Sequence, residues 1–384
     1  MKKPILYVGL DVHAASITPA VAEEGRDGEV RLHGNIGPNL HDVDKLLTRL
    51  GHPGKELRVC YEAGPCGFVL ARHLRKKGIS CTVAAPSLIP RAKGNKIKTD
   101  RRDAQQLARL HRAGELTAVH VPDPDDEAVR DLCRARTDAV EAMRRARSQL
   151  RAFLLRNGHR TTGTTEWGDP HKRTLRALKL RHPAMGQVLE DAITTIDAAY
   201  ERIARLEKAM TDQLEHWGQK PAVLALCGLR GFRTVAAMIT VSEIGSIHRF
   251  AKARQLMGFI GIVPGEHSTG ENRRVGSITK TGNTHLRWLI NECAQNYRLP
   301  PKVGKDLSAR QQAIAKEHRS AVQKISWKCQ QRLYSKGRKL AARLKMRQKV
   351  QIALARELCG FVWATLKAVQ PAEAGPPVPD RKAA

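Results

Sequence analysis

Four acidic residues in the first third of the chain have the types and spacing of a metal site. Asp11 closes one apolar run and Glu62 closes another, while Asp100 and Asp103 stand three residues apart and would share one face of a helix. Divalent ions that act on phosphodiesters need several such carboxylates, and four acids repel one another unless cations are bound. Taken singly, each acid fits a cap or a surface charge. The joint pattern favours a metal site, and we interpret His13 as an ordinary loop histidine.

A second segment with chemical potential lies between residues 258 and 283. It is dense in glycine, hydroxyl groups and cations. On a flexible loop before Gly270, Ser268 or Thr269 is a candidate nucleophile, although an unaided hydroxyl needs a metal or a base to activate it. A phosphate-gripping loop is an equal alternative, in which backbone charge is neutralised by three cations: Arg273, Arg274 and Lys280.

The pattern around the acids predicts the scaffold that must position them. Strands are expected over residues 5–11, 17–23, 31–36, 57–62 and 80–85, and helices over 41–50, 68–77 and 100–113. Three strands, helix, strand, helix, strand is the order of the ribonuclease H-like α/β sheet. Its first and fourth strands are neighbours, so Asp11 and Glu62 would lie side by side. Thr99 is the expected cap of the helix that carries Asp100.

The rest of the chain is predicted to be helical and basic. Within residues 126–217, an apolar seam over 189–210 fits a helix pair inside one chain and a dimerising coiled coil equally well. The first helix of this region carries four arginines expected to bind nucleic acid: Arg144, Arg145, Arg147 and Arg151. Near residue 228 a glycine-rich turn resembles a helix-hairpin-helix, whose backbone amides would approach a phosphate.

These patterns divide the chain into four parts. We expect a catalytic domain over 1–125, a basic helical region over 126–217, a C-terminal domain over 218–370 and a disordered tail over 371–384. The charge points to the partner: 67 lysines and arginines against 37 acids leave a net charge of +30, which attracts polyanions such as nucleic acid. The sequence predicts no membrane span and, from eight scattered cysteines, no zinc site, which favours a cytoplasmic location.

With these residues in view, the chain resembles the DEDD transposases of the insertion sequence 110 family, the bridge-RNA-guided recombinases. The resemblance covers nearly the whole chain. Six motifs carry it, in the same order: Gly9-Leu-Asp11, Glu62-Ala-Gly64, Lys98-Thr-Asp-x-x-Asp-Ala104, Pro264 to Gly270, Ile278-Thr-Lys-Thr-Gly-Asn283 and Ala355 to Trp363.

The resemblance implies a RuvC-like domain of ribonuclease H fold, a coiled coil and a C-terminal transposase domain. It implies Asp11, Glu62, Asp100 and Asp103 as ligands of two magnesium ions. It also implies a serine that attacks DNA to give a covalent phosphoserine, and a guide RNA that pairs with donor and target DNA. The family often carries serine just before the loop glycine, where this chain has Thr269. We prefer Ser268, one residue earlier, because a primary hydroxyl is less hindered.

The expected function is therefore that of an RNA-guided, magnesium-dependent DNA recombinase that excises and inserts its own mobile element. We expect it to act as a homo-oligomer, a dimer that assembles into a tetramer on DNA, at the bacterial nucleoid. Two alternatives remain open. One is a RuvC-like nuclease that cleaves DNA by hydrolysis, and the other is a non-catalytic nucleic-acid scaffold. The intact acidic quartet argues against the scaffold.

Overall fold

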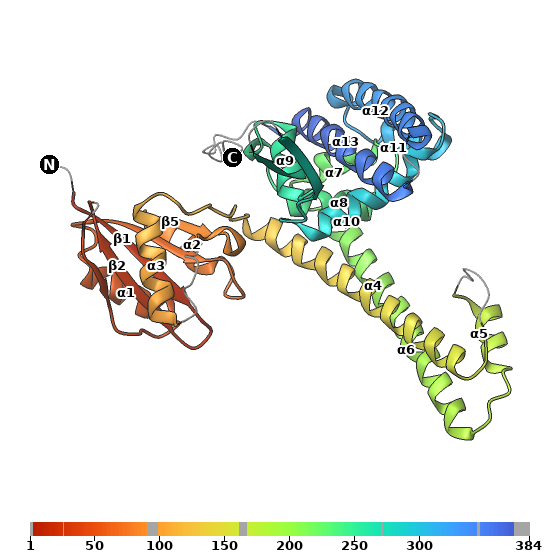
Figure 1. Ribbon diagram of the computed structural model, residues 1–384, viewed down its shortest axis with the longest axis horizontal. Helices are drawn as coiled ribbons and strands as arrows, with labels where there is room; N and C mark the ends of the chain where they lie inside the picture. The colour runs from red at the N-terminus through yellow and green to blue at the C-terminus, as the bar shows by residue number, and fades with distance from the viewer. Residues whose placement is uncertain are drawn as a thin grey trace. The chain divides into compact units, whose positions relative to one another are not determined.

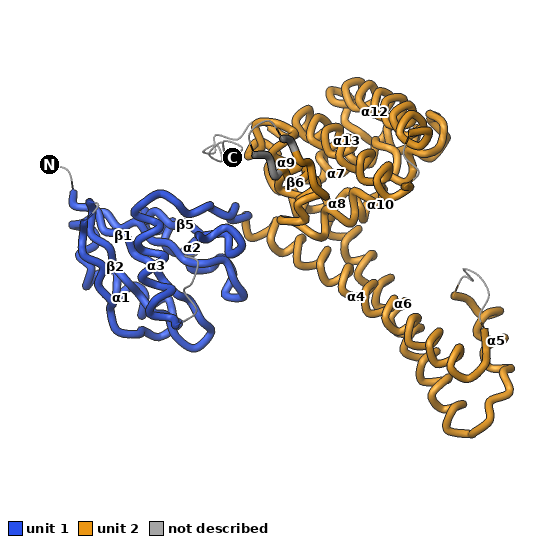
Figure 2. The backbone as a smooth tube through the Cα atoms, viewed as in Figure 1, with its two compact units in different colours: residues 1–122 blue, residues 123–384 orange. Residues whose placement is uncertain are grey.

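A computed structural model describes residues 3–25, 27–90, 99–160, 167–269, 272–343 and 346–371. The chain divides into two compact units, residues 1–122 (unit 1) and residues 123–384 (unit 2), shown in blue and orange in Figure 2. Most of the predicted basic loop over 90–98, Gly270 and the predicted tail from residue 372 lie outside the described residues.

Unit 1 is a five-stranded sheet with helices on both faces. The strand order is β3-β2-β1-β4-β5, with β1 antiparallel to β2 and parallel to β4. The order of elements follows the sequence prediction, except that the third strand is shorter and continues only as an isolated bridge between Ile17 and Ile36. The bounds are β1 Ile5–Val12, β2 Ile17–Glu23, β3 Val30–Leu32, α1 Leu40–Arg49, β4 Glu56–Glu62, α2 Val69–Lys76, β5 Ser80–Ala84 and α3 Asp100–Arg112.

The two faces of this sheet are packed differently. On one face, Val8 and Leu10 of β1 belong to a large aliphatic core that includes residues of α1 and α2. The other face carries α3, which crosses the strands in Figure 1. Here small residues meet, since Ala20 and Ala22 of β2 pack on alanines of α3. Small side chains let a helix lie close to a sheet, so α3 is held near β1 along its length.

The first half of unit 2 is a long pair of helices. Helix α4 (Pro124–Arg156) runs antiparallel to α6 (Pro183–Leu214), and α5 (Asp169–Arg176) follows between them in the chain (Figure 1). The predicted apolar seam of α6 packs on α4 of the same chain: Leu189, Ile196 and Met210 are buried. Of the two arrangements left open by the sequence, the structure contains the helix pair inside one chain.

The second half of unit 2 is a helical body around one large apolar core. A single two-stranded antiparallel hairpin, β6 with β7, interrupts the helices among the described residues. The bounds are α7 Lys220–Cys227, α8 Thr234–Ile244, α9 Ala253–Ile260, β6 Pro264–Thr269, β7 Asn272–Ile278, α10 Thr284–Ala294, α11 Lys305–Gln312, α12 Lys316–Arg343 and α13 Arg347–Lys367, with short 3-10 turns at Ile247–Arg249 and Gln295–Arg298. Unit 1 has one such turn among its described residues, at Pro86–Leu88.

The glycine-rich turn between α7 and α8 is packed against protein. A Cβ added at Gly228 would lie 2.8 Å from side-chain atoms of Ile314 and Val322. At Gly231, where φ is +88°, it would lie 2.6 Å from the carbonyl oxygen of Cys293. Both glycines therefore serve close packing within unit 2. The phosphate-binding role suggested by their spacing stays a prediction.

Within the described residues, no helix combines the length and apolar character that crossing a bilayer requires.

Candidate active site

Asp11 and Glu62 stand at matching positions on neighbouring strands. The parallel ladder of β1 and β4 pairs Gly9 with Cys60 and Leu10 with Tyr61, so the next step along both strands reaches Asp11 and Glu62. Successive residues of a strand alternate between faces, which puts these two acids on the same face as Gly9 and Cys60. The sequence prediction that the first and fourth strands are neighbours is confirmed.

That face of the sheet is the one covered by α3. A Cβ added at Gly9 would lie 2.4 Å from the carbonyl oxygen of Ala104, and the Cys60 thiol donates to the carbonyl oxygen of Leu107 at 3.5 Å. Only glycine at position 9 permits this approach. Since α3 lies directly on β1, its N-terminal turn is brought to the end of the strand where Asp11 is located.

The N-terminal turn of α3 carries the other two acids. The Thr99 hydroxyl accepts a hydrogen bond from the amide of Arg102 at 3.4 Å, as its predicted capping role requires. Asp100 and Asp103 both lie in the first turn, where the positive end of the helix dipole favours negative charge. The helix thus partly offsets the repulsion between the acids that it carries.

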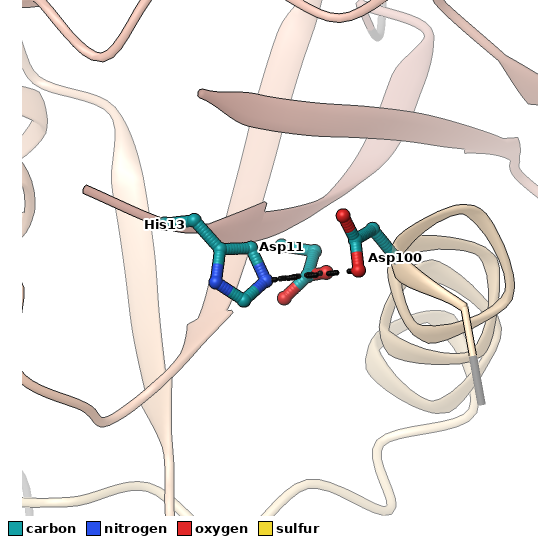
Figure 3. A group of neighbouring side chains, drawn as sticks. All are labelled: Asp11, His13 and Asp100. Atoms are coloured by element: carbon teal, nitrogen blue, oxygen red, sulfur yellow. Dashed lines mark hydrogen bonds and ion pairs between the residues drawn. The ribbon is translucent and has the colours of Figure 1, made fainter. Parts of the chain in front are cut away.

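Three side chains converge in this corner: Asp11, His13 and Asp100 (Figure 3). One ligand atom from each lies within 4.8 Å of the others. The His13 Nε2 atom is 3.2 Å from Asp11 Oδ2 and 3.9 Å from Asp100 Oδ1. Asp11 is the sheltered member, with 15% of its side chain exposed against 59% for Asp100. Among the described residues this is the one group with the donors and spacing of a metal site.

The pKa of Asp11 is affected by the charges of the neighbouring acids. Burial raises the pKa of Asp11, His13 opposes the rise, and the Asp100 and Asp103 carboxylates add to it. Repulsion of this kind is relieved when a cation binds between carboxylates. The donor set fits a divalent ion: carboxylates suit Mg²⁺ and Mn²⁺, and an imidazole is a ligand of the transition metals. Asp103, in the same helical turn as Asp100, and Glu62, at the end of the strand beside β1, are not members of this group.

The predicted hydroxyl segment forms part of a β-hairpin, where the sequence suggested a flexible loop. Ser268 is paired with Arg273 and Thr269 with Asn272 in the antiparallel ladder of β6 and β7. Ser268 and Thr269 thus occupy successive register positions beside a strand that carries the two arginines expected to grip phosphate, Arg273 and Arg274. A regular ladder fixes the backbone more tightly than a loop does.

The segment that follows β7, residues 279–283, is held to the helical body by hydrogen bonds. Lys280 has a φ of +56°, a conformation that non-glycine residues rarely adopt, and its amide donates to the carbonyl oxygen of Gly261. Asn283 caps α10 through its side-chain oxygen and donates its side-chain amide to Glu243 at 2.7 Å. Surrounding contacts therefore hold the predicted phosphate ligand Lys280, which is exposed, in an uncommon conformation.

Glu243 also ties this segment to the long helix pair. Its carboxylate, 3% exposed, accepts two hydrogen bonds from Arg134 of α4, at 2.7 and 3.0 Å. Burial raises the pKa of Glu243, but the hydrogen bonds and charge of Arg134, together with the lesser effects of Asn283 and His285, hold the pKa below its ordinary value. One buried carboxylate thus joins α4, α8 and the start of α10.

The four predicted nucleic-acid arginines of α4 differ in their surroundings. Arg144 lies over the ring of Trp288, 5.0 Å from its centroid, and Arg147 donates to the hydroxyl of Tyr200 at 3.1 Å. Arg145 and Arg151 are exposed, and no hydrogen bond or ion pair holds them within the described part of the chain. These last two are the arginines of the set that are free to meet a phosphate.

Two residues of these sites were not found by sequence reasoning. His13 was interpreted as a loop histidine, yet its ring contacts two of the predicted metal ligands. Its position two residues after Asp11, just past the end of β1, was the available signal. Glu243 lies in an apolar helix, and its partners Arg134 and Asn283 are distant in sequence. A lone acid in an apolar helix was the only sign of it.

Comparisons with known proteins show the family to which this chain belongs. A model of the IS110-type DEDD transposases, described as Transposase, matches residues 8–157, and one described as Transposase IS116/IS110/IS902 family matches residues 223–304. A putative transposase, y4qE, of Sinorhizobium fredii is 43% identical over 93% of this chain and 87% of its own length. The transposase for insertion sequence element IS1533 of Leptospira borgpetersenii is 28% identical over 90% of this chain and 99% of its own. This chain belongs to the IS110/IS116/IS902 family of transposases.

Proposed function

We propose that this transposase is an RNA-guided DNA recombinase that depends on Mg²⁺ and works through a covalent phosphoserine. The observation that carries the proposal is the convergence of Asp11, Asp100 and His13 at the end of β1. A cluster of acids at one corner of an α/β sheet has little structural value without cations, because the charges repel. The N-terminus of α3 favours negative charge, which suits the carboxylates that it carries and a phosphate bound beside them.

In this proposal Asp11, Glu62, Asp100 and Asp103 hold the ions. When bound, Mg²⁺ supplies Lewis-acid polarisation of a scissile phosphate and stabilises negative charge on its oxygens. Asp11 comes from the sheet and Asp100 from the helix, so the approach of α3 to Gly9 sets their separation. His13 stands within contact of both and would orient them or join them as a ligand.

The strand-exchange step belongs to the hairpin of unit 2. The Ser268 oxygen would attack the scissile phosphorus, forming a serine–phosphorus ester while the bond from phosphorus to the leaving sugar oxygen breaks. The hydroxyl proton passes to that leaving oxygen. The reverse reaction, with a new sugar hydroxyl as the attacking group, releases Ser268 and rejoins the DNA. Arg273, Arg274 and Lys280 would neutralise the phosphates on either side.

Thr269 is the competing nucleophile, because it occupies the place where the family often carries serine. The two residues occupy successive register positions in β6, and in this proposal only one of them attacks the phosphate. We favour Ser268 for its less hindered hydroxyl. The alternative enzyme is a hydrolytic nuclease, in which water attacks and both hydroxyl residues serve only to bind phosphate.

The partners in this proposal are donor DNA, target DNA and a guide RNA encoded by the element. The net charge of +30 supports polyanion binding, and Arg145 and Arg151 of α4 are exposed with no ion pair to any residue that the structure describes. We propose in addition that the chain acts as a dimer that assembles into a tetramer on DNA at the nucleoid. The long pair of α4 and α6 is the element that we expect to mediate assembly through a coiled coil.

The test is to look for a protein–DNA adduct that survives denaturation. Purified protein is incubated with element-end DNA, with and without the element's RNA, in Mg²⁺ or in EDTA, and then run on a denaturing gel. An adduct that needs both RNA and Mg²⁺ is the expected result. Cleaved DNA without any adduct would instead identify the hydrolytic nuclease, and an adduct of equal yield without RNA would refute guidance by RNA.

A further inference from the structure

The outward face of α12 differs from the rest of this helix. Val322, Cys329 and Leu333 are fully buried, and α12 lies beside α13 (Figure 1). The opposite side is exposed from residue 324 to residue 339, a length of about 22 Å at the rise of an α-helix. Steps of three and four residues place the following side chains along it: Lys324, Trp327, Lys328, Gln331, Ser335, Arg338 and Lys339.

This face, which we call the α12 face, carries cations without acids. No ion pair engages Lys324, Lys328 or Lys339 within the described part of the chain, and Arg338 contacts only the ring of Tyr334, 5.9 Å from its centroid. The sole acid of α12 is Glu317, in the first turn. Like charges on one face repel at a cost to the folded state, so a surface of this composition favours a polyanionic partner.

A large aromatic side chain lies among these cations. Trp327 is 42% exposed, whereas Trp217 is buried and Trp288 is covered by Arg144. An exposed tryptophan gains from covering its ring, and a flat base does so by stacking. Trp327 lies one residue before Lys328 and three after Lys324, so a base on the ring would have its phosphates beside cations.

The flank of the same helix supplies a contrast. Arg332 donates to Glu357 of α13 at 2.8 Å, and Lys336 contacts the same carboxylate at 2.6 Å. These two cations have a protein partner and bind α12 to α13. The unpaired lysines of the α12 face have no such structural task in the described chain.

We propose that the α12 face binds an unpaired segment of a folded RNA, with a base stacked on Trp327 and the neighbouring phosphates on Lys324 and Lys328. Double-stranded DNA keeps its bases stacked inside the helix and offers no free base face. Folded RNA presents unstacked bases in its loops and bulges, where proteins stack aromatic side chains on them. The inference rests on the proposed binding of RNA and adds its place and mode.

The first test separates unpaired cations from paired ones at equal charge. The full-length chain with Lys324→Gln and Lys328→Gln is compared with Arg332→Gln and Lys336→Gln, using a fluorescent hairpin RNA over a salt series. Loss of two contacts to single-stranded phosphate should lower the slope of log affinity against log salt by about 1.4. The Arg332 and Lys336 pair should change the slope much less. Equal slopes for both double variants would overturn the proposal.

The second test asks for stacking itself. Trp327→Ala should weaken binding of the hairpin RNA by about five- to a hundredfold, and Trp327→Phe, which keeps an aromatic face, should recover most of it. Binding of a blunt RNA duplex or a DNA duplex should be unchanged by either substitution. The hairpin RNA should also quench the tryptophan fluorescence of the wild type more than that of Trp327→Phe.

The outcomes distinguish this inference from the proposed function. If Trp327→Ala binds the hairpin RNA as the wild type does, or loses the duplexes equally, the α12 face is not a site for unpaired RNA, although RNA-dependent adduct formation can still stand. If the wild-type chain binds no hairpin RNA at all, the RNA part of the proposed function fails first. Thermal melting of each variant confirms that it is folded.

Discussion

The two chemical regions of this transposase are positioned by different means. In unit 1, the acids are located by sheet register and by the close approach of α3 to Gly9. In unit 2, the hairpin that carries Ser268 is followed by a segment held by polar contacts, from Gly261, Asn283 and Glu243. A site built on buried strands depends on packing, whereas a site built on a braced hairpin depends on individual hydrogen bonds. The two should therefore fail differently when they are perturbed.

The largest effect is expected from the acids themselves. Asp11→Asn, Glu62→Gln, Asp100→Asn and Asp103→Asn should each abolish recombination in Mg²⁺, because each removes a ligand charge without opening a cavity. The circular dichroism spectrum and the melting temperature of each variant should equal those of the wild type. Wild-type recombination rates in two or more of these variants would show that the four acids do not form a catalytic metal site.

Gly9→Ala tests whether packing sets that site. Its Cβ would lie 2.4 Å from the Ala104 carbonyl oxygen and 2.5 Å from the Ala108 amide, so α3 must shift. We expect a loss of roughly 1–3 kcal/mol in the free energy of unfolding, as overpacking costs, together with weaker Mn²⁺ binding. Gly34→Ala is the matched control, because no atom lies within 4 Å of its added Cβ. Equal melting temperatures for the two variants would argue against the close approach.

In unit 2 the corresponding test is Glu243→Gln. It removes the charge that Arg134 and Asn283 bind, and a loss of about 1–3 kcal/mol in the free energy of unfolding is expected. The control is Glu207→Gln, because Glu207 is 37% exposed where it meets Arg136 and should matter less. Chemical denaturation compares them, and equal losses would show that burial is unimportant here.

The same pair gives a pH dependence. Because the pKa of Glu243 is lowered in the folded chain, its contribution is complete above the ordinary glutamate pKa of about 4.3 and is lost as the pH falls through the lower folded value. The difference in stability between the wild type and Glu243→Gln should thus be constant near neutral pH and shrink in acid. A difference that grows in acid would contradict the ion pair.

The smallest effect is expected on α4. Arg145→Gln with Arg151→Gln should weaken RNA binding more than Arg144→Gln with Arg147→Gln, because the latter two already contact Trp288 and Tyr200. Each double variant removes the same charge, so a difference between them reports whether the arginines are free to bind phosphate. A salt titration measures it, and a flat salt dependence of the wild type would refute the electrostatic basis altogether.

Much of unit 1 could be predicted because local periodicity and tertiary contacts agree there. Alternation in β1 and β4 located Asp11 and Glu62, and the Thr99 cap located Asp100. The third strand was extended too far, since residues after Leu32 pair with β2 only at Ile36. The closeness of His13 to Asp11 in the sequence was a local signal, but its second contact, to Asp100 of α3, crosses to another element and is marked by no local pattern.

The hairpin of unit 2 was harder to foresee. Glycine and hydroxyl residues predict loops on composition, yet this segment pairs as β6 and β7. What brings its neighbours together is a contact between Glu243 and residues 109 and 40 positions away. No periodicity encodes a pairing of that kind. The helix pair of α4 and α6 was foreseen as a pattern, while the choice between one chain and two needed the structure.

Mapping the protein–DNA adduct by peptide mass spectrometry would locate the proposed hydroxyl nucleophile on β6. We expect attachment at Ser268. The adduct should be lost in Ser268→Ala, with RNA and DNA binding retained, and partly retained in Thr269→Ala. Attachment at Thr269 would move the nucleophile by one residue and contradict our assignment. Active enzyme with no attachment on β6 at all would contradict the covalent mechanism.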